Sequence, residues 1–286
     1  MPYNTSDIQA LVQEVVHNSL TAPLEETSSF LSLGPQIVDS ATPVRFPTLS
    51  GSFAVGFVGE AEDIPVQDGP VFDDVTLMPS SMKSIKSITK ISEESLRQSS
   101  QALDSILSNR LVVDVQRKLD EQLWSAEGDG VETPKGVLHP SNVTNFQTVD
   151  VAGAALSLDD LHDAVGAALS NDVPLGGLRW VLRPEQLTGL RKIKDASGQY
   201  IVNSDVTTAN GYTLLGVPVQ VTKRLPAGNA ILLNPSSWAV VRDLSPQVQV
   251  LTELYAGSGE IGLKIGARFD AGALLPEANV LLTEIS

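Results

Sequence analysis

From residue 91 to residue 127 the chain contains neither proline nor glycine, the two residues that most often end a helix. Ser92 can cap a helix start here, and Glu93 and Glu94 suit the positive end of its dipole. Apolar residues then recur at helical spacing, at Leu96, Leu103, Ile106, Leu107, Leu111, Val115, Leu119 and Leu123. The sequence therefore predicts one helix over 92–126. It would be about 50 Å long, more than a compact domain of this size needs.

A helix-ending motif follows this predicted helix, and no heptad repeat continues beyond it. Gly128-Asp129-Gly130 ends it, and the chain continues directly into Thr133-Pro134-Lys135-Gly136 and a mixed α/β region. The apolar stripe is not a sustained heptad repeat, which argues against a coiled coil.

The segment before the helix is long and acidic. Between Arg45 and Lys83 there is no lysine or arginine, while several residues are acidic: Glu60, Glu62, Asp63, Asp68, Asp73 and Asp74. Residues 46–58 and Val71–Leu77 are typical of strands, with a turn at Asp68-Gly69-Pro70. A lone hairpin is marginally stable in water, so we expect this one to rest on another surface. The alternative is a sheet edge within its own domain.

The rest of the chain predicts an α/β unit and a returning strand. A helix over 157–170 capped by Ser157, a strand at 178–182 and a helix opening at Pro184 lead into short strands at 214–221, 230–233 and 239–241. We expect the last strand, 279–283, to pair with the strand near 75–90. Residues 6–19 predict a short amphipathic helix, either a surface helix of its own subunit or an arm that docks on a neighbour.

Composition and motifs argue against most chemistry. The net charge of −15 does not suit a dedicated nucleic-acid-binding surface, although an acidic wall can enclose DNA. There is no cysteine, and the histidines, His17, His139 and His162, share no metal-binding pattern. No nucleophile elbow, P-loop or dinucleotide motif is present. We therefore expect no enzyme activity, cofactor or metal, and neither a signal peptide nor a membrane span.

The order of motifs resembles that of major capsid proteins of tailed bacteriophages, the Hong Kong 97-type fold, which encapsulins share. The motifs are Val75-Thr76-Leu77, Ser92-Glu93-Glu94, the spine helix through 110–123, Gly128-Asp129-Gly130 and Pro134-Lys135-Gly136-Val137-Leu138. Softer matches are Arg183-Pro184-Glu185 and Leu215-Gly216-Val217-Pro218-Val219.

The resemblance implies an α+β fold with four parts. These are an N-terminal arm (1–42), an extended β-hairpin loop (43–76), a peripheral domain with the spine helix (77–150 and 256–286) and an axial α/β domain (151–255). It also implies a protein that self-assembles through hexamers and pentamers into an icosahedral shell around double-stranded DNA, bound without sequence specificity. Assembly would take place in the host cytoplasm.

The resemblance implies further partners as well. A portal, a maturation protease and a cement protein are expected, and since the chain starts with only a short helix, scaffolding would be a separate protein or absent. Some members join subunits through a loop lysine. Residues 46–82 contain no lysine, so we expect no such crosslink.

Charge suggests one contact between subunits. We expect the loop acids Glu60, Glu62 and Asp63 to face bases on the neighbouring peripheral domain: Lys83, Lys86, Lys90, Arg110, Arg117 and Lys118. Two other interpretations stay open, an encapsulin-type compartment with enzyme cargo and, more remotely, a soluble α/β enzyme.

Overall fold

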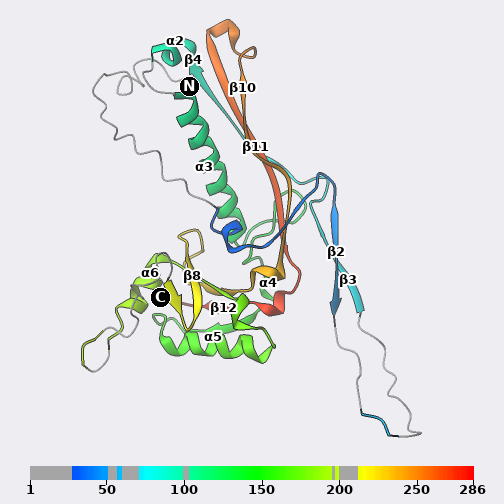
Figure 1. Cartoon of the computed structure of the whole chain (residues 1–286), viewed down its shortest axis with the longest axis vertical. Helices are drawn as coiled ribbons and strands as arrows, with labels where there is room; N and C mark the ends of the chain where they lie inside the picture. The colour runs from blue at the N-terminus through cyan, green and yellow to red at the C-terminus, as the bar shows by residue number, and fades with distance from the viewer. Residues whose placement is uncertain (1–27, 51–56, 60–70, 99–102, 195–196, 200–211) are drawn as a thin grey trace.

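The computed structural model describes residues 28–50, 57–59, 71–98, 103–194, 197–199 and 212–286. These residues form a four-stranded sheet in the order β1-β10-β11-β4, a six-stranded sheet in the order β5-β12-β9-β6-β8-β7, and the two-stranded hairpin β2-β3. Figure 1 shows the two larger sheets one above the other, with the hairpin projecting from the side of the molecule.

The four-stranded sheet carries a helix along one face. Its strands are β1 (Gln36–Asp39), β4 (Ile85–Ser92), β10 (Trp238–Leu251) and β11 (Glu260–Ala273). The helix α3 (Leu103–Trp124) buries Val115, Leu119 and Leu123 in the largest apolar cluster. Among the residues that the structure describes, no helix lies on the opposite face of this sheet (Figure 1).

The prediction of one helix over 92–126 is corrected in its bounds. The structure describes α2 (Glu93–Gln98) and α3 as separate helices, with the residues between them outside the described ranges. Ser92 ends β4 and directly precedes α2. Helix α3 is about 33 Å long at ~1.5 Å per residue, shorter than expected.

The six-stranded sheet holds the second core. Its strands are β5 (Gln147–Asp150), β6 (Arg179–Leu182), β7 (Tyr212–Leu214), β8 (Val217–Val221), β9 (Ala230–Leu233) and β12 (Val280–Thr283). Helix α5 (Leu158–Ser170) begins at the predicted cap, where Ser157 and Asp160 form a capping box, and it buries Leu161 against this sheet. Helix α6 (Pro184–Arg191) starts at the predicted proline.

The short helical turns connect these elements. They are η1 (Leu31–Leu33), α4 (Pro140–Val143), η2 (Leu175–Gly177), η3 (Pro235–Ser237), η4 (Ala256–Ser258) and η5 (Pro276–Ala278). The segment 214–221 was expected as a strand broken at Gly216 and Pro218. It belongs to two strands, because Leu215 and Gly216 both have positive φ and turn the chain back as a hairpin, whereas Pro218 lies within β8.

The prediction that the last strand pairs near 75–90 is wrong. Strand β12 lies between β5 and β9 in the six-stranded sheet, and β4 pairs with β11 instead. Strand β10, expected to be short, runs the length of the first sheet beside β11. Strand β10 falls in the predicted axial range, but it lies in one sheet with β4 and β11 of the predicted peripheral range. Strands β5 and β12 fall in the predicted peripheral range, but they lie in the six-stranded sheet. The four domain ranges remain a prediction.

The N-terminal segment enters the core of its own subunit. Phe30 is 1% exposed and packs edge-on against Trp124 and Trp238, with ring centroids 5.3 Å and 5.8 Å away. The buried Asp120 of α3 accepts hydrogen bonds from the Ser28 hydroxyl and from the amide and hydroxyl of Ser29, at 2.6 Å and 2.9 Å for the latter two. Residues 28–39 contain η1 and β1. The helix expected at 6–19 lies outside the described residues.

Candidate assembly interface

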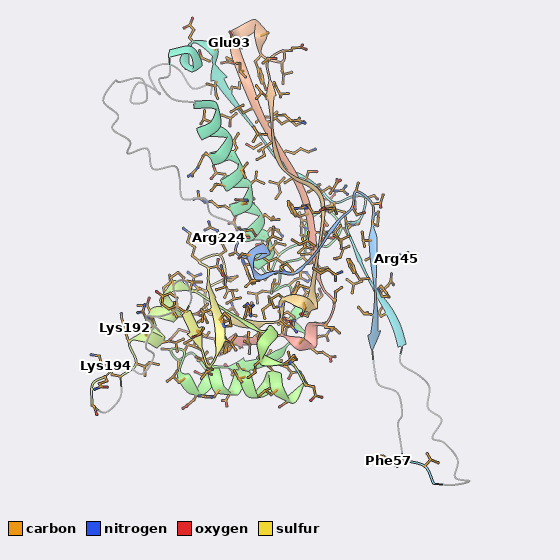
Figure 2. All side chains as sticks on the ribbon, viewed as in Figure 1. Arg45, Phe57, Glu93, Lys192, Lys194 and Arg224 are labelled. Carbon is orange, nitrogen blue, oxygen red and sulfur yellow. The ribbon has the colours of Figure 1, made fainter. Side chains whose placement is uncertain are left out.

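The hairpin is a two-stranded ribbon that leaves the body of the molecule. Strand β2 (Val44–Ser50) pairs with β3 (Val71–Leu77) in one unbroken antiparallel register. Figure 2 shows Phe57 at its far end, well away from both larger sheets. The side chain of Phe57 is fully exposed at 111%. The extended excursion expected from the sequence is therefore present, and Phe57 stands away from both larger sheets.

The root of the hairpin is fixed to β11. Met78, which has a φ of 60°, donates its backbone N–H to Asp270 Oδ2 at 2.7 Å. Arg268 reaches the carbonyl of Pro79 at 2.9 Å and Asp243 at 3.2 Å. A side chain at Gly272 would come within 2.7 Å of Leu77, so this glycine lets β3 lie close to β11. The hairpin thus leaves the body in a defined direction.

Burial raises the pKa of the Asp270 carboxyl, which is 3% exposed. Hydrogen bonds from Met78 and from the Ala271 amide at 2.9 Å act in the opposite direction, as do the charges of Lys135 and Arg268. A single carboxylate held by backbone donors suits an anchor for the hairpin root.

The segment after α3 folds back onto the end of that helix. Val137 donates its N–H to the carbonyl of Leu123 at 2.7 Å, which pairs a carbonyl that the helix leaves free, and Gly136 donates its N–H to the carbonyl of Glu127 just beyond the helix at 3.0 Å. A Cβ at Gly136 would lie 2.0 Å from the Ser125 carbonyl oxygen. This close approach explains why the motif after the helix needs glycine at this position.

The exposed Asp129 orders the same loop. Its Oδ1 accepts the backbone N–H groups of Val131, Glu132 and Thr133 at 2.8–3.0 Å, and these bonds lower the pKa of its carboxyl. The Gly-Asp-Gly stop expected from the sequence is thus a hydrogen-bonded loop. It is not an acid–base pair.

The predicted basic residues are mostly paired within their own subunit. Lys83 pairs with Glu132, Arg110 and Arg117 share Asp114 at 3.1 Å and 3.2 Å, and Lys118 pairs with Glu121 at 2.9 Å. Lys90 lies 3.7 Å from Glu260 and 4.1 Å from the ring centroid of Tyr255. Lys86 is exposed and has no ion pair with any residue in the described ranges. Glu60, Glu62 and Asp63 lie outside those ranges, so the contact itself remains a prediction.

The sequence reasoning passed over two residues of this region, Lys264 and Phe57. Lys264 on β11 also has no ion pair in the part of the chain that the structure describes. Its register partner is Ile88, which places it beside Lys86 on β4. Phe57 was passed over because an exposed phenylalanine in a strand-like segment looks like a core residue until the topology is known.

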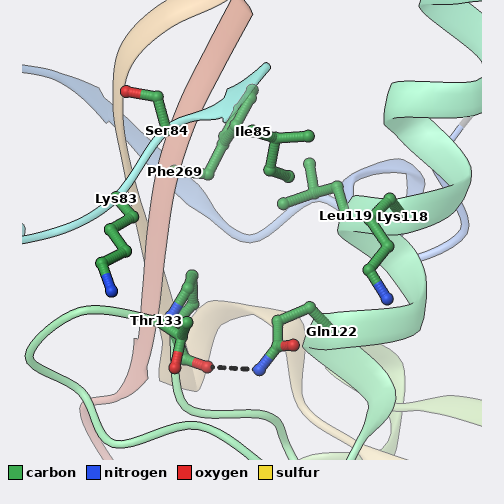
Figure 3. Close-up of a pocket in the computed structure, with 9 residues that line it drawn as sticks. Lys83, Ser84, Ile85, Lys118, Leu119, Gln122, Thr133 and Phe269 are labelled. Carbon is green, nitrogen blue, oxygen red and sulfur yellow. Dashed lines mark hydrogen bonds between the residues drawn. The ribbon is translucent and has the colours of Figure 1, made fainter. Parts of the chain in front are cut away.

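A small cavity lies between α3 and the start of β4 (Figure 3). It measures about 190 Å³, and Ile85, Leu119 and Phe269 give it apolar walls with Lys83 and Lys118 beside them. The residues that line it include these two lysines but no carboxylate and no histidine. Within the described ranges no three His, Cys, Asp or Glu side chains gather as metal ligands, and no helix has the length and hydropathy to cross a bilayer.

Comparison with known families gives a match over almost the whole chain. The model of the phage capsid family matches residues 9–283. The chain belongs to the phage capsid family. No curated protein sequence matches it.

Solved structures show the same fold at low sequence identity. The capsid of an empty GTA particle has a TM-score of 0.74 and 18% identity, over 97% of this chain and 96% of that chain. A protein of Mycobacterium phage Bobi has a TM-score of 0.73 and 18% sequence identity, over 99% of each chain. A protein of Mycobacterium phage Cain has a TM-score of 0.70 and 19% sequence identity, over 100% of this chain and 98% of that chain. The predicted α+β fold of the Hong Kong 97 type is thereby confirmed, and this family member is a structural protein of a phage capsid.

Proposed function

We propose that the chain is the major capsid protein of a tailed bacteriophage, and that many copies assemble through hexamers and pentamers into an icosahedral shell around double-stranded DNA. The observation that carries this proposal is the family match over residues 9–283. A hairpin anchored at its root and exposed at its tip supports it, because such an element gains stability only by contact with another surface.

In this proposal the four predicted parts have separate tasks. The axial domain meets its copies around the capsomer axis, the peripheral domain forms the wall, and the hairpin lies over the adjacent subunit. The protein acts without catalysis and is assembled in the host cytoplasm. In the virion it forms the shell together with a portal. A separate scaffold, a protease and a cement protein are further proposed partners.

Expression of the full chain alone tests the proposal. We expect size-exclusion chromatography followed by negative-stain electron microscopy to show closed shells of uniform diameter, or rings of five and six copies. A monomer or dimer at every salt and protein concentration would contradict it. Double-stranded DNA in native particles would support the phage assignment, whereas a loaded enzyme would indicate an encapsulin.

A further inference from the structure

The cavity between α3 and the start of β4 combines apolar walls with charged edges (Figure 3). Ile85 of β4, Leu119 of α3 and Phe269 of β11 form its walls, so three separate elements meet there. Leu119 is 1% exposed and Phe269 is 4% exposed, and these walls therefore belong to the core. At about 190 Å³ the cavity is larger than the roughly 150 Å³ that holds a benzene ring in an engineered protein. It has room for one ring and a short polar group.

Hydrogen bonds tie the walls of this cavity to one another. The backbone N–H of Lys83 donates to the carbonyl of Glu132 at 2.8 Å, which joins the start of β4 to the loop after α3. The side-chain amide of Gln122 on α3 donates to the carbonyl of Pro134 in the same loop at 2.9 Å (Figure 3). The cavity is thus preformed, and a ligand would bind without the cost of ordering its walls.

Two lysines lie at the edges of the cavity. Lys83 and Lys118 both line it, and Figure 3 shows their side chains on opposite sides of it. Their carboxylate partners, Glu132 and Glu121, are not among the lining residues, and all four side chains are more than half exposed. An exposed ion pair is worth little, and each lysine carries three N–H donors. Each ammonium group can therefore bind an anion in the cavity while it keeps its present partner.

Charge and shape together define the class of ligand. None of the described residues that line the cavity is acidic, so the lining offers a cation no opposite charge. Glu121 and Glu132 balance part of the lysine charge, which favours an anion with one negative charge over a phosphate with two. Apolar walls beside an empty space lack dispersion contacts, which a ring or a branched chain would supply. The cavity thus fits a compact apolar body that carries one carboxylate.

We propose that this cavity is a binding site for a small monocarboxylate, with its apolar body against the walls and its carboxylate beside Lys83 and Lys118. A bound ligand contacts α3, β4 and β11 at once, so it stabilises their packing and the folded subunit. The site is formed by residues of one subunit and is therefore present in a free subunit and in a shell alike. A negative result at this site would leave the proposed function untouched.

Four small molecules test the ligand class on the full chain. Phenylacetate has a ring and a carboxylate, phenylacetamide has a neutral amide instead, phenylethylamine has a cation instead, and acetate lacks the ring. We expect phenylacetate to raise the temperature of unfolding as its concentration rises, and to bind at least about tenfold more tightly than the other three in titrations followed by ligand-observed NMR. Equal binding of the amide, or no binding of phenylacetate at millimolar concentration, would overturn the proposal.

Charge variants test the part played by the lysines. Lys83→Met with Lys118→Met removes both charges and keeps the aliphatic side chains, so it should weaken the binding of phenylacetate about tenfold and leave that of phenylacetamide unchanged. Lys192→Met with Lys223→Met, at exposed positions outside the lining, removes the same charge elsewhere and is the control. If both double variants bound phenylacetate equally well, the lysines would have no part in binding and the proposal would be wrong.

A larger side chain tests the cavity itself. Ile85→Phe places a ring in the space of the ligand, so it should abolish the binding of phenylacetate and phenylacetamide alike. Ile88→Phe on the same strand, at a position 49% exposed and outside the lining, should bind as the wild type does. Circular dichroism checks that both variants are folded. Undiminished binding to folded Ile85→Phe would contradict the site, and the exposed lysine variants decide the question should Ile85→Phe not fold.

Discussion

At the scale of single residues, close backbone contacts and buried hydrogen bonds explain parts of the sequence that look arbitrary. The Pro-x-Gly motif after α3 needs glycine because the returning chain touches the end of the helix. Asp120 is a charged residue on the buried side of α3, and it is tolerated because Ser28 and Ser29 supply hydrogen-bond donors.

Replacing Gly136 by alanine should destabilise the subunit. The new Cβ would lie 2.0 Å from the Ser125 carbonyl oxygen, which the backbone cannot accommodate without moving. We expect a loss of about 1–3 kcal/mol in the free energy of unfolding, measured by denaturant titration. Gly166→Ala on α5, where the added Cβ meets no atom within 4 Å, is the control and should be neutral or stabilising. Equal stability of the two variants would contradict this account of the motif.

Replacing Asp120 by asparagine should also cost stability. The Ser29 amide and the two serine hydroxyls lose a charged acceptor, and a buried donor left without a partner costs roughly 1–3 kcal/mol. Asp114→Asn, on the same helix but in exposed ion pairs, should cost about 0–1 kcal/mol. Thermal unfolding of both variants distinguishes them; a larger effect at Asp114 would show that the buried cluster contributes little.

At the scale of elements, local signals predicted what lies within one segment. Ser157 and Pro184 start helices where the sequence places them, since caps act on their nearest neighbours. Strand partners could not be predicted in this way: β11 and β12 both follow the axial range in sequence, and the assembled sheets decide that β11 pairs with β4. The length of β10 was hidden too, because its register shifts near Leu244 interrupt the alternating pattern.

For the candidate interface, too, local features could be predicted from the sequence and contacts between distant segments could not. The acidic hairpin could be predicted, since composition and turn residues are local. The choice among the bases could not, because an ion pair such as Lys83–Glu132 joins segments far apart in the sequence. The neighbours of Lys264 could not be predicted either, because its place beside Ile88 comes only from the register of the sheet.

The anchor of the hairpin root should respond to acid in a defined direction. Burial raises the pKa of Asp270, so the folded state binds this proton more tightly than the unfolded state does. The free energy of unfolding of the wild type, relative to an Asp270→Asn variant that cannot titrate, should therefore rise as the pH falls from 7 toward about 4, and level off below the unfolded pKa of Asp. Denaturant titrations across this range measure the difference. A difference that falls with falling pH would contradict the assignment.

At the scale of the whole molecule, the architecture is that of a part made to be completed by its copies. The subunit is held together by two main cores, while the hairpin is fixed at its root and projects from the side of the molecule. Each contact between exposed charges is worth little alone, but a closed shell repeats it many times.

A shell of this protein should separate completely into monomers on a denaturing gel. The segment 46–82 has no lysine for a covalent link from the hairpin, and the chain has no cysteine for a disulfide. We expect one band at the monomer mass of 30.4 kDa from purified particles, with or without reductant. A ladder of larger bands from the wild-type chain would contradict a shell held only by non-covalent contacts.

Cryo-electron microscopy of assemblies of the full chain tests the central claim most directly. The account predicts rings of five and six copies within a closed shell, with each hairpin lying across the adjacent copy. Assemblies without these rings, or rings in which every hairpin folds back on its own subunit, would contradict it.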